Sequence, residues 1–84
     1  MTNKETLKKQ IIYRSTHRGS KEMDILLGSF VKKYIDHFSD NDLQNLHDLL
    51  SIEDEILHRY YFEKISSEEI PKNKVIEKFK SFRL

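Results

Sequence analysis

The chain has 84 residues, enough for one domain around a single small core. It contains no cysteine, which leaves no disulfide framework and no thiolate chemistry. No run of about 18 apolar residues is present, so we expect no membrane-spanning segment. Residues 1–10 carry no signal-peptide pattern, and we therefore predict a cytoplasmic protein.

The first predicted helix covers about residues 3–17. Thr2 and Glu5 have the spacing of a capping box at its start. Gly19 is expected to end this helix in the left-handed conformation that glycine adopts at little steric cost. Ser20 follows as the N-cap of the next helix.

The second predicted helix, about 21–38, has the strongest periodicity in the chain. Its apolar residues follow the i, i+3, i+4, i+7 rule: Met23, Leu26, Leu27, Phe30, Val31, Tyr34 and Phe38. Gly28 lies inside it, where glycine costs about 1 kcal/mol of helix propensity relative to alanine. We expect a close approach by another helix at Gly28 to offset that cost.

Three shorter helices are predicted in the rest of the chain. Ser39 caps one that ends near Leu50, Ser51 with Asp54 begins the next, and the last covers about 73–82 after a loop. Two glycines and one proline among 84 residues also favour helix over a turn-rich β fold. The predicted fold class is all-α: a compact antiparallel bundle of five helices forming a single domain over residues 1–84.

The charges are unevenly distributed along the chain. Residues 1–33 hold eight Lys and Arg against three Asp and Glu, residues 34–69 hold two against ten, and residues 70–84 hold five against one. This order is compatible with solvated helix faces, with ends that fold against the middle, or with a partner of mixed charge. A nucleic-acid-binding domain is usually more basic overall than a chain of pI about 8.0, so we expect no nucleic-acid partner.

Several kinds of chemistry lack their sequence patterns. Two isolated glycines supply neither a dinucleotide-binding turn nor a phosphate-binding loop. The four histidines have no partners at metal-ligand spacing, so no metal site is predicted. No nucleophile and base come with a third orienting group. The sequence therefore predicts no enzyme.

One segment resembles a known family closely. The run is Tyr13-Arg14-Ser15-x-His17-Arg18-Gly19-x-Lys21-Glu22-Met23-Asp24-x-x-Leu27-Gly28-x-Phe30. It is similar to the signature of the succinate dehydrogenase FAD assembly factors, the small flavinylation factors with an Arg-Gly-x-x-Glu motif. A looser similarity continues through Leu49-Leu50, Glu53-Asp54, Leu57 and Tyr60, so that the resemblance covers roughly residues 11–65. The chain departs from the family at Glu55, where proline is frequent, and at Tyr60, where tryptophan is common.

The resemblance implies a five-helix bundle with a chaperone-like role. Such a factor binds the flavoprotein subunit of succinate dehydrogenase and promotes covalent attachment of FAD to it, with the related fumarate reductase subunit as a second candidate client. The FAD belongs to the client, and this chain is expected to bind no cofactor stably and to act as a monomer without contact to a membrane. A small helical adaptor for another flavoprotein or a regulatory partner is the alternative, and a nucleic-acid-binding helical domain is a less favoured one.

The resemblance also implies which residues contact the partner. Three belong to the motif and three flank it: Arg18, Gly19 and Glu22, with His17, Lys21 and Asp24. We expect the turn to hold Arg18 and Glu22 outward and Arg18→Ala to leave the fold intact. On a purely structural interpretation, Arg18 and Glu22 are helix-end charges worth about 0.3–1 kcal/mol each. Tyr60 is expected to pack in the core, as are Met23, Leu27 and Phe30.

Overall fold

The computed structural model describes residues 3–84 and contains five α-helices in them. Their bounds are α1 Asn3–Thr16, α2 Lys21–Tyr34, α3 Asp40–Leu50, α4 Asp54–Phe62 and α5 Lys74–Ser81. No strand occurs in these residues. The prediction of an all-α bundle of five helices is therefore confirmed.

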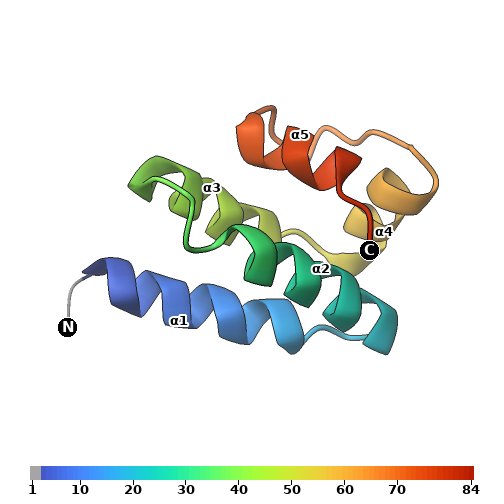
Figure 1. Cartoon of the computed structure of the whole chain (residues 1–84). Helices are drawn as coiled ribbons and strands as arrows, with labels where there is room; N and C mark the ends of the chain where they lie inside the picture. Colours follow the sequence, from blue (N-terminus) through green and yellow to red (C-terminus); the bar gives the residue numbers. More distant parts are fainter. Residues whose placement is uncertain (1–2) are drawn as a thin grey trace.

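Helices α1, α2 and α3 run back and forth beside one another, so that each is antiparallel to the next (Figure 1). α1 packs against both α2 and α3. α5 lies on the other side of α3 and also contacts α4, which is set at one end of the molecule. The α1–α2 turn lies at that same end, and this arrangement determines the geometry of the site described below.

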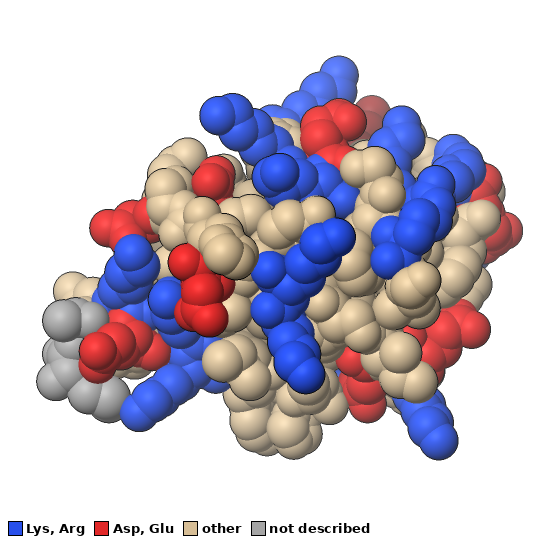
Figure 2. Space-filling view, in the orientation of Figure 1, with Lys and Arg blue, Asp and Glu red and all other residues tan. Residues whose placement is uncertain are grey.

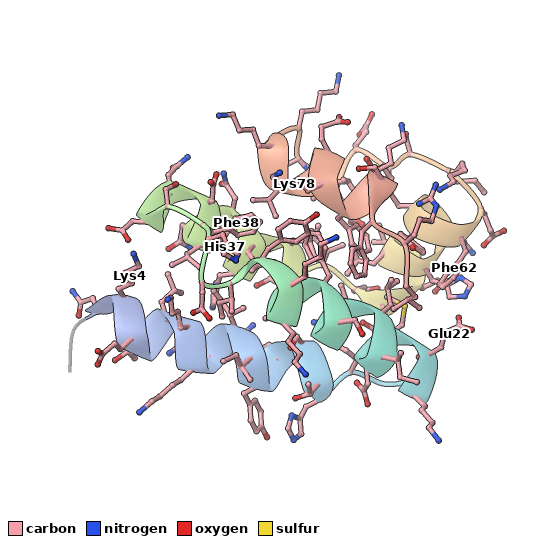
Figure 3. All side chains as sticks on the ribbon, viewed as in Figure 1. Lys4, Glu22, His37, Phe38, Phe62 and Lys78 are labelled. Carbon is pink, nitrogen blue, oxygen red and sulfur yellow. The ribbon has the colours of Figure 1, made fainter. Side chains whose placement is uncertain are left out.

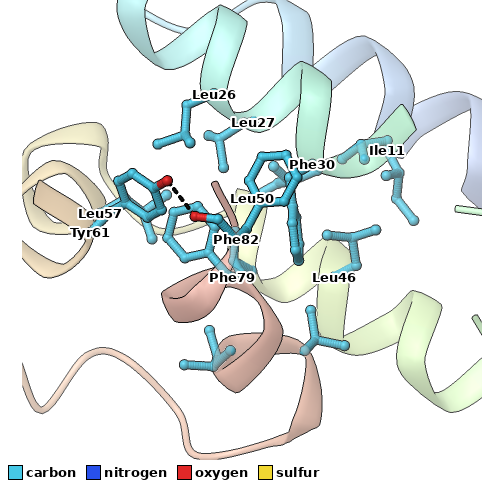
Figure 4. Packing of buried hydrophobic residues seen from close by; sticks show 14 of the residues in the cluster. Ile11, Leu26, Leu27, Phe30, Leu46, Leu50, Leu57, Tyr61, Phe79 and Phe82 are labelled. Atoms are coloured by element: carbon cyan, nitrogen blue, oxygen red, sulfur yellow. Dashed lines mark hydrogen bonds between the residues drawn. The ribbon is translucent and has the colours of Figure 1, made fainter. Parts of the chain in front are cut away.

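One hydrophobic core joins all five helices (Figure 4). Met23, Leu27 and Phe30 are at most 1% exposed, as predicted for the inner face of α2. The ring of Phe30 meets Phe79 of α5 edge to face, with ring centroids 5.5 Å apart. Tyr61 fixes the end of the chain, because its hydroxyl donates a hydrogen bond to the carbonyl oxygen of Phe82. The aromatic side chains thus tie the C-terminal segment to α2 and α4.

Tyr60 is 7% exposed and packs in the core, as predicted. Burial is the larger cause, and the negative charge of Glu77 the smaller, of a pKa for Tyr60 above its usual value. Both effects favour the neutral phenol. The side chain therefore fits a packing role.

Two predicted helix starts are confirmed by their caps. The Ser20 hydroxyl accepts from the amide of Met23 at 3.2 Å, and the Ser39 hydroxyl accepts from the amide of Asp42 at 3.2 Å. The predicted end of α2 at residue 38 is wrong, because the helix ends at Tyr34. A tight turn follows, in which the amide of His37 donates to the carbonyl of Tyr34 at 2.9 Å.

The predicted start of α4 at Ser51 is also wrong. The Ser51 hydroxyl turns back and donates to the carbonyl of His47 at 3.2 Å, so Ser51 closes α3 instead. Glu53 is the N-cap of α4 and makes no side-chain capping bond. The carboxylate of Asp54, expected to complete the cap, bonds instead to the α1–α2 turn.

The two glycines differ in how well their predicted roles hold. Neither has a positive φ, so the left-handed helix end expected at Gly19 is wrong. The close approach expected at Gly28 is confirmed, since a Cβ added there would lie 3.3 Å from the Thr16 side chain of α1. The capping box predicted for Thr2 lies outside the described residues.

Candidate partner-binding site

Arg18 lies in the turn between α1 and α2, and its side chain points into the molecule. Only 10% of that side chain is exposed. Nε donates to Oδ1 of Asp54 at 2.6 Å, and Nη2 donates to the carbonyl of Ile52 at 2.8 Å. Nη1 donates to the carbonyl of Leu50, the last residue of α3. The guanidinium thus joins the α1–α2 turn to the α3–α4 turn and satisfies backbone carbonyls that the end of α3 leaves open.

The inward direction of Arg18 corrects the expectation that the turn holds this side chain outward. The expectation treated Arg18 as a helix-end cation with free donors. The end of α3 and the start of α4 supply a carboxylate and two carbonyls, 32 to 36 residues away in the sequence. A planar guanidinium with five donors in a fixed fork fits such a set of acceptors.

The backbone of the turn is held by carboxylates. The Gly19 amide donates to Oδ2 of Asp54 at 2.9 Å, and the Arg18 amide donates to Oδ1 of Asp24 at 2.6 Å. Asp54 therefore accepts from two neighbouring residues with its two oxygens. These bonds shape the turn without a left-handed residue. A Cβ on Gly19 would make an ordinary contact, 3.5 Å from Asp54 Oδ2, so the space there does not exclude a side chain.

Glu22 lies in the first turn of α2 and is accessible, with 59% of its side chain exposed. Its Oε1 is 2.7 Å from Nε2 of His58 on α4. The other ring nitrogen of His58 lies 3.9 Å from Glu63, and the ring packs on Phe62 at a centroid distance of 4.7 Å. Figure 3 shows Glu22 and Phe62 at the same end of the molecule. Glu22 is thus exposed but already has a hydrogen-bond partner.

His17 and Lys21 lie on the two sides of the turn and are both exposed. The His17 ring stacks on Tyr13, with centroids 3.9 Å apart and planes 12° apart. Its Nδ1 is 2.8 Å from the carbonyl oxygen of Tyr13, which orients the ring along α1. Lys21 makes no ion pair with the described residues. Both side chains are accessible to a partner.

The structure therefore divides the six predicted residues into two groups. Arg18, Gly19 and Asp24 bond to the framework through a side chain or a backbone amide. The exposed group consists of His17, Lys21 and Glu22. The partner-binding role of both groups remains a prediction from the family resemblance.

No group of three or more His, Cys, Asp or Glu side chains in residues 3–84 is placed to hold a metal ion. No helix among these residues has the length and apolar character needed to cross a membrane.

The comparison with known families decides the assignment. Residues 9–83 match the family described as flavinator of succinate dehydrogenase. The chain belongs to this family. Succinate dehydrogenase assembly factor 2, mitochondrial, of Meyerozyma guilliermondii is 43% identical over 47 residues, which are 56% of this chain and 35% of that protein. The chain thus spans about a third of the curated relative that it matches, and no solved structure matches it significantly.

In this member of the flavinator family, sequence analysis missed the two residues that organise the site. Asp54 was expected to cap a helix, yet it holds the turn. His58 was considered only as a metal ligand, yet it pairs with Glu22. The acidic pair Glu53-Asp54 within the family resemblance was the available signal for the first. Nothing in the sequence pairs Glu22 with His58, because 36 residues separate them.

Exposed apolar side chains flank the same site in this member of the family. Tyr13 of α1 is 63% exposed, Ile25 of α2 is 50% exposed and Phe62 of α4 is 42% exposed. Ile25 follows Lys21 by one helical turn, and Tyr13 precedes His17 by one turn. Apolar and charged side chains next to each other, with aromatic rings, are typical of the surfaces that bind proteins.

Proposed function

We propose that this chain is an assembly factor that binds the flavoprotein subunit of succinate dehydrogenase and promotes covalent attachment of FAD to that subunit. The observation that carries the proposal is the match to the flavinator of succinate dehydrogenase family over residues 9–83. The printed name of the Meyerozyma guilliermondii relative, a succinate dehydrogenase assembly factor, supports the same role. The related fumarate reductase subunit is a second client to test.

The geometry supports a contact surface at the α1–α2 turn. Glu22 offers a carboxylate that a client donor can reach, and His17 and Lys21 offer donors beside it. Arg18 acts as a positioning residue, because its side-chain donors bond to Asp54, Leu50 and Ile52. Gly19 and Asp24 belong with Arg18, since their bonds set the shape of the turn that presents Glu22.

In this proposal the chain is a chaperone and not an enzyme. FAD belongs to the client, this chain binds no cofactor stably, and the bond forms between the flavin and a histidine of the client. The chain acts as a monomer that holds the client in a competent arrangement. A cytoplasmic location remains the prediction from the sequence, whereas the yeast relative is named as mitochondrial.

The proposal is tested by producing the flavoprotein subunit with and without this chain. Protein-bound flavin is then scored by fluorescence in a denaturing gel, and co-purification of the two chains is followed in parallel. We expect the fluorescence to rise and the two chains to co-purify. No rise in fluorescence together with no co-purification overturns the assignment, and a pull-down from the host would then identify the partner of a helical adaptor.

A matched pair of variants localises the activity. Glu22→Ala should lower client flavinylation, because it removes the exposed carboxylate of the contact surface. Glu68→Ala removes an equally charged, exposed residue from the loop before α5 and should leave flavinylation unchanged. Equal effects of the two variants would place the contact surface elsewhere.

A further inference from the structure

A second charged surface lies away from the α1–α2 turn, over α5 and the residues beside it. Figure 2 shows Lys and Arg side chains gathered over the upper part of the molecule, where α5 lies. We name as the basic α5 surface the exposed cations Lys33, Lys64, Lys78, Lys80 and Arg83. They come from three separate segments of the chain, so the fold assembles this surface.

Aromatic rings place two of these cations close together. Nζ of Lys33 lies 5.4 Å from the centroid of the Tyr34 ring and 5.7 Å from that of Phe82. Nζ of Lys78 lies 5.3 Å from the same Tyr34 ring. The Tyr34 ring therefore has two lysines beside it, Lys33 from its own helix and Lys78 from α5. The quadrupole of the ring attracts both ammonium groups.

The other three cations line a shallow depression next to Lys78. Its volume is about 530 Å³, and its lining residues are Lys64, Glu77, Lys78, Lys80, Ser81 and Arg83. Nζ of Lys64 lies 5.3 Å from the ring of Tyr61. Nη1 of Arg83, which also lines the depression, donates to the carbonyl of Phe82 at 2.9 Å. Four positive charges thus surround one concave patch.

These five cations have no carboxylate at ion-pairing distance among the described residues. Lys4, Lys8 and Arg59, by contrast, each have one at 3.4 Å, 3.2 Å and 2.7 Å. Glu77 is the single acidic residue lining the depression. A concave patch in which four cations outnumber one carboxylate raises the local concentration of anions and favours an acidic partner.

We propose that the basic α5 surface docks an extended acidic segment of a protein partner. The cations are spread over α2, the segment after α4, and α5, so a chain with several carboxylates can meet them in turn. A compact phosphate group fits less well, because one small anion cannot meet cations that are spread over three segments of the chain.

The identity of the partner rests on the proposed function, since the acidic segment is taken to belong to the same client. The surface would then be a second contact, separate from Glu22. Two linked contacts strengthen binding through effective concentration even if each is weak alone. The test of the surface itself uses a peptide and needs no client, so the two proposals can fail independently.

The test is a titration of the ¹⁵N-labelled full chain with a synthetic peptide of eight glutamates at low salt, followed by NMR. We expect chemical-shift changes at Lys78, Lys80 and Arg83 and much smaller changes at Glu22. Binding should weaken steeply as salt is added, because exposed charges are screened. Peptides of eight glutamines, inorganic pyrophosphate and a short DNA duplex are titrated in the same way.

Two matched variants separate a specific surface from net charge. Lys78→Gln/Lys80→Gln and Arg14→Gln/Lys32→Gln each remove two exposed cations, from α5 and from the α1–α2 hairpin respectively. The α5 variant should weaken peptide binding about tenfold, as the loss of two charge contacts predicts. The hairpin variant should retain the affinity of the unmodified chain. Circular dichroism confirms that both variants fold.

The proposal is overturned if the glutamate peptide does not bind at low salt, or if both variants weaken it equally. It is also overturned if pyrophosphate or DNA changes the chemical shifts of Lys78, Lys80 and Arg83 and the glutamate peptide does not. That result would assign the surface to a phosphate ligand. Selective loss in the α5 variant, with no binding of the glutamine peptide, supports it.

Discussion

The two charged residues of the Arg-Gly-x-x-Glu motif are four positions apart and lie in opposite environments. The Arg18 side chain is 10% exposed and bonds to residues between the end of α3 and the start of α4. The Glu22 side chain is 59% exposed and pairs with His58 at the surface. One short motif thus contains a residue that builds the turn and a residue that the turn presents.

The difference in exposure implies that the two side chains contribute differently to the free energy of unfolding. Removing one partner of a largely buried, hydrogen-bonded ion pair leaves the other partner unsatisfied, which costs several kcal/mol. An exposed pair such as Glu22 and His58 is worth about 0–1 kcal/mol, because water and salt screen it. Variants of Arg18 should therefore change mainly stability, and variants of Glu22 should change mainly partner binding.

The largest expected effect is that of Arg18→Ala. The substitution leaves Oδ1 of Asp54 and the carbonyls of Leu50 and Ile52 without their guanidinium donors, and we expect the free energy of unfolding to fall by about 3 kcal/mol. Urea unfolding followed by circular dichroism measures the change. Arg14→Ala, an exposed residue of α1, is the control and should alter stability by about 0.5 kcal/mol or less. An Arg18 variant as stable as that control would show that the bonds of the guanidinium between the α1–α2 and α3–α4 turns do not contribute to stability.

Asp24→Ala should have an intermediate effect. It removes the acceptor of the Arg18 amide and an anion from the first turn of α2, for which we expect a loss of about 1 kcal/mol. Asp24→Asn keeps an oxygen acceptor and should recover part of that loss. The same urea titration applies, and a loss as large as that of Arg18→Ala would mean that the bond from the Arg18 amide to Asp24 stabilises the turn as much as the guanidinium does.

The smallest effect on stability is expected for Glu22→Ala, at about 0.5 kcal/mol or less. Client flavinylation should nevertheless fall about tenfold, because a charge-assisted contact to the partner is lost. Measuring unfolding and protein-bound flavin on the same preparation tests both parts. His58→Gln provides a comparison, since it removes the imidazole beside Glu22 but leaves the carboxylate in place. A Glu22 variant that unfolds readily would contradict the distinction between Arg18 as a stabilising residue and Glu22 as a contact residue.

The sequence predicted the local features of the fold well. The periodicity of α2, the caps at Ser20 and Ser39, and the close approach at Gly28 all depend on residues near one another in the chain or on the size of one residue. It failed at the α3–α4 corner, because Ser51 and Asp54 have capping-box spacing but each has a better partner. For Asp54 that partner is 36 residues away from it, and spacing carries no information about such a contact.

The same limit applies to the candidate site. The motif and the family resemblance located the turn, but the direction of the Arg18 side chain depends on where α3 ends relative to it. Helix-end charges alone supply no acceptors for the guanidinium inside the molecule, so the sequence predicts an outward side chain. Only the packing of α2 and α3 against α1 brings the carbonyls of Leu50 and Ile52 within reach of the guanidinium.

The sequence separation of the Arg18–Asp54 contact has a consequence for the order of folding. Each helix and the α1–α2 hairpin form through neighbours in sequence, which makes them fast, whereas a contact across 36 residues first requires the loop between them to close. We expect this contact to form after the main folding barrier. Arg18→Ala should therefore accelerate unfolding and leave the folding rate almost unchanged, so that the arginine extends the lifetime of a finished molecule.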